Sequence, residues 1–258
     1  MKHIPNIFTL CNLLLGCMSV VFTLSEAPFL NTVDYQNFYP ILGIRQMEWG
    51  AVCILLAALC DMLDGLAARV LNVYSPIGKD LDSLADLVSF GVAPSVIIYQ
   101  FLWCAYMAEP GAMDTPLWVL MPAFSIAIFA ALRLARFNIT SAAQKSHFIG
   151  LPVPTTGILV ACLPLVAMYQ RHFQELLLNR TYLYIFVAVL SFLMVSRVRF
   201  FKWQGKGGLR GWLPQLTVAA VLIASCVIFG LIGVYITFVA YLLLSLFYKA
   251  PDTAEAQA

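Results

Sequence analysis

Residues 60–95 read CDMLDGLAARVLNVYSPIGKDLDSLADLVSFGVAPS, and several aspartates of this segment lie within or beside two strongly apolar runs. A charged side chain at the centre of a membrane helix costs about 2.5–3.5 kcal/mol on insertion scales. If the runs span a bilayer, this cost applies to each of four aspartates: Asp61, Asp64, Asp82 and Asp86. Such a group of carboxylates therefore indicates a functional site.

The composition indicates that lipid surrounds most of the chain. Of its 258 residues, 62% are hydrophobic and only 11% are charged, and the mean hydropathy is +0.87. A water-soluble domain of this size could not bury so much apolar surface. The net charge of +2 is small, and we expect no nucleic-acid partner.

Apolar runs long enough to form membrane helices recur along the whole chain. They cover residues 5–24, 49–73, 83–104, 116–137, 154–170, 181–196, 213–229 and 231–248. The fold class predicted is all-α, a polytopic transmembrane helix bundle of about eight spans. No linker divides it, so we expect one membrane domain over residues 1–250, followed by a disordered polar tail at residues 251–258.

The distribution of basic residues predicts the orientation. With the N-terminus inside, all lysines and arginines except Arg45, Arg171 and Arg180 fall on the cytoplasmic side. This asymmetry follows the positive-inside rule. Both termini are then predicted to be cytoplasmic, in a multi-pass protein of the cell membrane whose aspartates lie near the cytoplasmic face.

The first run carries polar and small residues at helical spacing. The members of this stripe are Asn6, Thr9, Asn12, Gly16 and Ser19. Small and weakly polar residues on one face allow close contact between membrane helices. We interpret the stripe as a packing surface.

The four aspartates form two pairs. Asp61 and Asp64 are three residues apart, and Asp82 and Asp86 are four apart, so each pair shares one helix face. A short turn around residues 75–78 makes the two helices antiparallel neighbours, and their carboxylates are expected to converge. Two divalent cations would balance four negative charges, and hard oxygen ligands favour Mg²⁺ or Mn²⁺.

Neighbouring residues suit a substrate that carries phosphate. Gly65 and Gly78 allow a close approach of the backbone, the Arg69 guanidinium could bind a phosphate oxygen, and Ser75 offers a hydroxyl. Two metal ions could hold a pyrophosphate, and one aspartate could accept a proton from an attacking hydroxyl.

The pattern D-x2-D-G-x2-A-R-x8-G-x3-D-x3-D is matched at every fixed position from Asp61 to Asp86. This segment resembles the CDP-alcohol phosphotransferase family. The resemblance implies six core membrane helices, a homodimer, and divalent metals held by Asp61, Asp64, Asp82 and Asp86. It also implies that Asp86 is the general base, and that Gly65, Arg69 and Ser75 contact the CDP group, with Gly78 beside them.

Four further strings extend the resemblance to one branch of the family. They are IPNIFTL at residues 4–10, DSLADLVSFGVAP at 82–94, RLARFN at 133–138 and GLPVP at 150–154. These strings are similar to the membrane-embedded phosphatidylserine synthases of bacteria and archaea. The resemblance implies CDP-diacylglycerol as donor, L-serine as acceptor, and phosphatidylserine and CMP as products.

Two basic residues and an asparagine end the fourth run on the predicted cytoplasmic side. Arg133, Arg136 and Asn138 are candidates for binding the acceptor, and the two arginines could equally be ordinary positive-inside anchors.

Other functions remain open. Glycerol 3-phosphate or an inositol phosphate could replace serine as acceptor in the same chemistry. A cation-coupled transporter could also use an intramembrane carboxylate cluster, although no internal repeat is visible. A structural scaffold would leave the aspartates unexplained.

Overall fold

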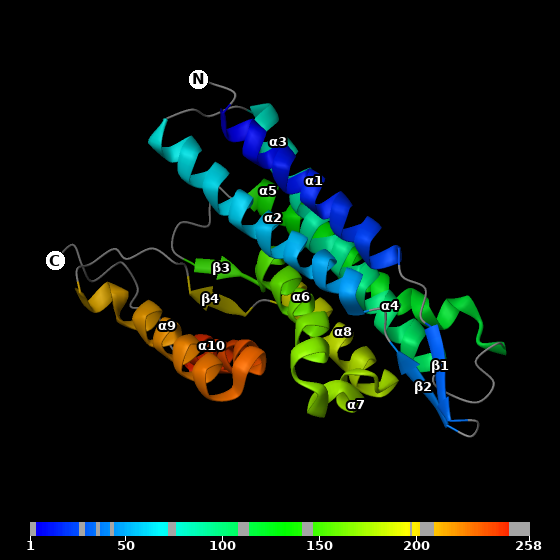
Figure 1. Ribbon diagram of the computed structural model, residues 1–258. Coiled ribbons are helices and arrows are strands. Elements are labelled where there is room, and N and C mark those ends of the chain that lie inside the picture. The colour runs from blue at the N-terminus through cyan, green and yellow to red at the C-terminus, as the bar shows by residue number, and fades with distance from the viewer. Residues whose placement is uncertain are drawn as a thin grey trace.

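The computed structural model describes residues 4–25, 29–34, 37–41, 44–71, 76–107, 114–140, 147–196, 198–201 and 209–247. The described part of the chain is a bundle of long helices (Figure 1). The predicted tail at residues 251–258 and the predicted site residue Ser75 lie outside the described residues.

The first two helices form an antiparallel pair. Helix α1 covers Ile4–Leu24 and α2 covers Ile44–Val70, and they lie side by side along most of their length (Figure 1). Gly50 of α2 makes this packing close, because a Cβ there would lie 2.6 Å from the Thr23 hydroxyl and 3.1 Å from the Ser19 carbonyl oxygen. The stripe on α1 is thus partly the packing surface that the sequence predicts.

The central helix of the bundle is interrupted by a π-helical turn. Helix α3, Pro76–Leu87, passes through η1, Val88–Val92, into α4, Ala93–Met107. Ile97, Ile98 and Leu102 of α4 are completely buried. This helix is buried all round because the other helices pack around it.

The next helices complete the first bundle. They are η3 (Leu117–Phe124), α5 (Ser125–Thr140), α6 (Val153–Tyr169), η4 (Arg171–Phe173), α7 (Gln174–Leu177) and α8 (Arg180–Val195). Gly157 of α6 packs directly on η1, since a Cβ there would meet Phe90 Cδ1 at 2.8 Å. Contacts of this kind fix η1 between α1, α5 and α6.

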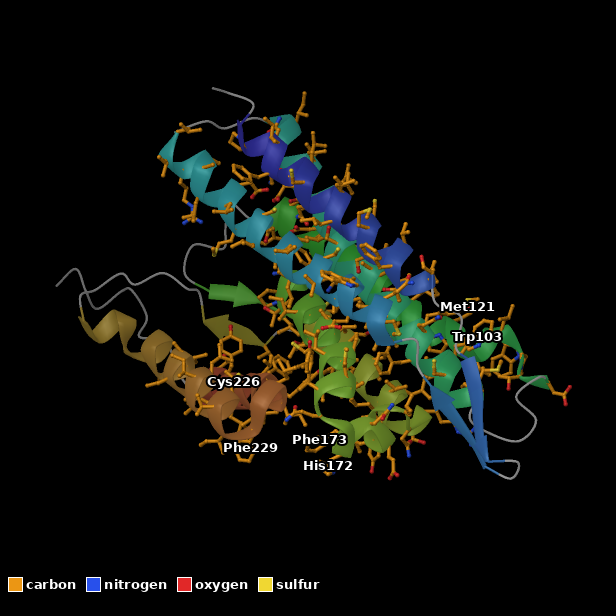
Figure 2. All side chains as sticks on the ribbon, in the orientation of Figure 1. Trp103, Met121, His172, Phe173, Cys226 and Phe229 are labelled. Carbon is orange, nitrogen blue, oxygen red and sulfur yellow. The ribbon has the colours of Figure 1, made fainter. Side chains whose placement is uncertain are left out.

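The last two helices form a separate hairpin beside α6. Helix α9 covers Leu209–Phe229, η5 covers Gly230–Ile232 and α10 covers Gly233–Phe247. Gly230 has a φ of 66°, which only glycine adopts readily. Gln170 holds the turn: its Nε2 donates to the Phe229 carbonyl oxygen at 2.6 Å, and its Oε1 accepts from the Ile232 amide at 3.1 Å. Figure 2 labels Phe229 at this turn and Phe173 of η4 on the same side of the molecule.

Two short antiparallel sheets of two strands each accompany the helices. Strands β1 (Phe29–Asp34) and β2 (Asn37–Ile41) pair antiparallel with a bulge between Thr32 and Asp34, between the first two predicted membrane runs. Strands β3 (His147–Ile149) and β4 (Arg199–Phe201) pair with His147 opposite Phe201. The all-α prediction is confirmed for the bundle and omits these strands, because strands this short leave only a weak sequence signal.

The helices match the predicted membrane runs. Five apolar stretches have the length of membrane spans: residues 5–24, 46–70, 77–107, 117–139 and 217–245. The last of these contains both α9 and α10, and α6 and α8 are shorter apolar helices. Exposed side chains such as Leu14, Leu132 and Phe192 cover the outer faces, as expected for surfaces in contact with lipid. The chain is a multi-pass membrane protein.

Candidate active site

Carboxylates from two helices converge at one end of the bundle. Asp61 and Asp64 lie in the last turns of α2, and Asp82 lies on α3. One oxygen atom from each of the three lies within 4.8 Å of the other two. Asp64 is buried, and Asp61 and Asp82 are half-buried. The predicted convergence of the two helices is confirmed, and the oxygens are close enough to coordinate a common divalent cation.

Asp86 lies beside these three side chains. It is buried, with 7% of its surface exposed, and it is close enough to interact electrostatically with Asp61, Asp64 and Asp82. Its Oδ1 accepts a hydrogen bond from Nδ2 of Asn12 at 3.2 Å. Asp86 thus faces the same cluster but has a partner of its own on α1.

Helix α1 also binds a second carboxylate. The Thr9 hydroxyl lies 2.9 Å from Oδ2 of Asp64 and 3.1 Å from the Pro5 carbonyl oxygen. A hydrogen bond to a ligand carboxylate fixes the orientation of its oxygens. Our interpretation of the α1 stripe as a packing surface was therefore incomplete, since Thr9 and Asn12 belong to the site. The available signal was that both are polar and lie three residues apart on one helix face.

Close contact between α1 and η1 positions Asn12. Ser89 donates from its hydroxyl to the Asn12 carbonyl oxygen at 2.8 Å. A Cβ on Gly16 would overlap the Ser89 side chain, so glycine is required there for α1 to lie so near. This contact holds the Asn12 amide over Asp86.

The π turn directly after Asp86 changes the face that the central helix presents. Its extra residue rotates α4 relative to α3, so that α3 can turn its aspartates to the site while α4 is buried. π turns occur often at functional sites. The sequence signal was Pro94, which lacks the amide hydrogen needed to continue a regular α-helical ladder at that point.

Of the residues predicted to contact the CDP group, Gly65 and Arg69 follow Asp64 on α2, and Gly78 precedes Asp82 on α3. A Cβ on Gly65 would meet only Nη2 of Arg69, at 3.7 Å, so packing within the described chain does not require glycine there. Arg69 is exposed and donates from Nε to the Gly65 carbonyl oxygen at 2.9 Å. Gly78 is half-buried in the first turn of α3.

The three candidate acceptor residues on α5 differ in their contacts. Arg133 is half-buried, interacts electrostatically with Asp86 and lies over the Phe137 ring at 5.7 Å. Arg136 is exposed. Asn138 donates from Nδ2 to the Ser83 hydroxyl at 2.9 Å, and its carbonyl oxygen accepts from Lys79 at 3.1 Å. Asn138 therefore links α5 to α3, and Arg133 is the candidate close enough to Asp86 to interact with it electrostatically.

Comparison with known protein families identifies the fold and its chemistry. Residues 2–193 match the family described as CDP-alcohol phosphatidyltransferase. The chain belongs to this family. The match spans the region from α1 to α8 and includes all four aspartates, whereas α9 and α10 lie beyond it.

The chain is similar to curated relatives, two of which carry the same name. The chain is 34% identical over 198 residues to the CDP-diacylglycerol–serine O-phosphatidyltransferase of Helicobacter pylori. The aligned segment covers 76% of this chain and 70% of the relative. It is 30% identical over 204 residues to the enzyme of the same name from Bacillus subtilis, covering 78% and 90%. It is also 33% identical over 162 residues to the archaetidylserine synthase of Methanothermobacter thermautotrophicus, covering 61% and 60%.

Proposed function

We propose that the chain transfers the phosphatidyl group of CDP-diacylglycerol to the hydroxyl of L-serine, giving phosphatidylserine and CMP. The single observation that carries the proposal is the convergence of Asp61, Asp64 and Asp82 beside the buried Asp86. Membership of the family and the names of the relatives from Helicobacter pylori and Bacillus subtilis support serine as the acceptor.

The four aspartates are the proposed ligands of two divalent cations, Mg²⁺ or Mn²⁺. The donor set fits these ions, because carboxylate oxygens are hard ligands and three of them lie within 4.8 Å of one another. When bound, such cations would neutralise the pyrophosphate and offset the charge that develops on departing CMP. Thr9 keeps the Asp64 oxygens in place through its hydrogen bond.

Asp86 is the proposed general base. As the serine oxygen attacks the phosphorus of the phosphatidyl group, its proton passes to the Asp86 carboxylate. A bond forms between the serine oxygen and that phosphorus, and the bond from the phosphorus to the oxygen of CMP breaks. CMP leaves with the electron pair of the broken bond. Asn12 holds Asp86 in position, because its amide donates to the carboxylate oxygen.

The residues around the aspartates are assigned to the two substrates. Gly65 leaves room for the CDP group, and Gly78 and Ser75 are assigned to the same group. Arg69 is assigned to a phosphate oxygen. Arg133 is assigned to the acceptor because it interacts electrostatically with Asp86, the proposed base.

The arrangement in the cell is also proposed. The protein would be a homodimer. The six-helix catalytic core of each chain would consist of α1, α2, α3–α4, η3–α5, α6 and α8. The positive-inside distribution supports both termini and the active site on the cytoplasmic side of the cell membrane.

The experiment that tests the function measures CMP release by the purified full chain in detergent. CDP-diacylglycerol and Mn²⁺ or Mg²⁺ are supplied with L-serine, glycerol 3-phosphate or an inositol phosphate, each radiolabelled. The proposal expects label in lipid with L-serine only, loss of CMP release on chelation, and no turnover in a membrane-inserted Asp86→Asn variant. If another acceptor gives labelled lipid, that molecule replaces serine as the proposed acceptor. If no acceptor gives CMP release, the enzymatic function is overturned.

A further inference from the structure

Two buried polar atoms close to Asp86 have no hydrogen-bond partner within the described part of the chain. They are Oδ1 of Asn12 and Nε of Arg133. Asn12 is completely buried, with 0% of its surface exposed. A buried polar atom without a partner destabilises a fold, so its persistence needs an explanation. One atom is an acceptor and the other is a donor.

The surrounding contacts fix the orientation of the Asn12 amide. Nδ2 donates to Asp86 at 3.2 Å, and Ser89 binds the backbone carbonyl oxygen of the same residue. Turning the amide over would remove the hydrogen bond to Asp86 and place two oxygens together. The free position beside Asp86 is therefore a hydrogen-bond acceptor, Oδ1.

Arg133 lies on another helix, near enough to the same carboxylate to interact with it electrostatically. Helices α1 and α5 both pack against η1, which begins two residues after Asp86, and the Arg133 guanidinium interacts electrostatically with Asp86. An unpaired acceptor and an unpaired cationic donor thus lie on two elements that meet around the proposed base.

This pair complements an α-amino acid that carries a hydroxyl. Such an acceptor presents an ammonium group, which needs a hydrogen-bond acceptor, and a carboxylate, which needs a cationic donor. A phosphate-bearing acceptor such as glycerol 3-phosphate has no ammonium group, so Asn12 Oδ1 would stay unpaired. Leaving a polar atom of the site unpaired is an effective way to reject a substrate.

We propose that Asn12 is the residue that selects the amino group of the acceptor: its Oδ1 accepts from the ammonium while its Nδ2 holds Asp86 beside the acceptor hydroxyl. Arg133 Nε donates to the acceptor carboxylate on the other side. The inference rests on the proposed function and adds to it the feature that distinguishes an amino acid from other alcohols.

The test compares L-serine with 3-hydroxypropionate, which lacks only the ammonium group. The KM for serine and the inhibition constant of 3-hydroxypropionate are measured in the wild-type chain and in Asn12→Leu. Loss of the contact between Asn12 and Asp86 affects binding of both molecules alike. The ratio of the serine KM to the 3-hydroxypropionate inhibition constant therefore reports on the contact to the ammonium group. We expect the serine KM to rise about 10-fold or more, as for loss of a charge-assisted hydrogen bond, with 3-hydroxypropionate changed by less than about 3-fold.

A matched control and a second measurement keep the outcomes separate. Ser19→Ala removes another buried, unpartnered hydroxyl of α1 and should change neither constant. If Asn12→Leu has no turnover, calorimetric titration with the two molecules replaces the kinetic constants. Equal weakening of serine and 3-hydroxypropionate, or an unchanged serine affinity, overturns the inference. If the wild-type chain releases no CMP with any acceptor, the proposed function is overturned instead. The titrations would still decide the role of Asn12.

Discussion

Thr9 and Asn12 bind carboxylates that lie 55 and 74 residues further along the chain. The aspartate pairs themselves could be predicted, because spacings of three and four residues place side chains on one helix face whatever the rest of the fold does. The contacts of Thr9 and Asn12 could not be predicted in this way. They depend on how α1 packs against α2 and η1, which helical periodicity does not specify.

Replacing Thr9 by valine removes the hydrogen bond to Asp64 while keeping the shape of the side chain. We expect the Mn²⁺ concentration for half-maximal CMP release to rise about 10- to 100-fold, as observed when a partner of a metal ligand is lost. Thr23→Val is the matched control on the same helix, because the Thr23 hydroxyl is buried without a partner in the described residues. An equal effect of both substitutions would contradict the role of Thr9.

Alanine substitutions at Gly65 and Gly157 allow an effect on substrate binding to be distinguished from an effect on packing. Gly65→Ala has space for its Cβ in the free protein, so we expect an unchanged melting temperature and at least about a 10-fold loss of kcat/KM for CDP-diacylglycerol, equivalent to about 1.4 kcal/mol. Gly157→Ala places a Cβ 2.8 Å from Phe90, and we expect it to lower the melting temperature through overpacking. Full activity of Gly65→Ala would remove the argument for a ligand above this glycine.

Among the elements, η1 and the α9–α10 hairpin show what the hydropathy of the chain does not predict. The apolar run at residues 83–104 predicts one regular helix, and composition alone does not reveal the π turn inside it. The break at Gly230 is visible in the sequence, and two helices were expected around it. Its attachment through Gln170 depends on the end of α6, sixty residues away in the chain.

Gln170→Met should detach the hairpin turn from α6. Two hydrogen bonds are lost, each contributing about 0.5–1.5 kcal/mol to stability, so we expect a lower melting temperature in detergent. CMP release at low temperature should stay unchanged, because the hairpin lies beyond the family match and away from α3 (Figure 1). A loss of turnover without a loss of stability would mean that the hairpin takes part in catalysis.

At the scale of the whole molecule, composition predicts that the chain lies in a membrane, and the distribution of charge predicts its orientation. The 62% hydrophobic content predicts a membrane protein, and five apolar stretches of spanning length confirm it. The side of the membrane on which the aspartates lie stays a prediction from the distribution of lysine and arginine.

Reporter fusions test this orientation. A reporter that is active only in the cytoplasm should be active when fused after residue 258, and inactive when inserted between residues 108 and 113. The reverse pattern would place the aspartates on the outer face and would remove the proposed access to cytoplasmic serine.

Mn²⁺ binding to the purified chain, followed by electron paramagnetic resonance, tests whether the carboxylates of α2 and α3 share cations. The account predicts two Mn²⁺ ions per chain with spectra broadened by mutual coupling, and loss of that coupling in Asp61→Asn and in Asp82→Asn, which change one helix each. Uncoupled spectra in the wild-type chain, or coupling that survives both substitutions, would contradict a metal centre shared by the two helices.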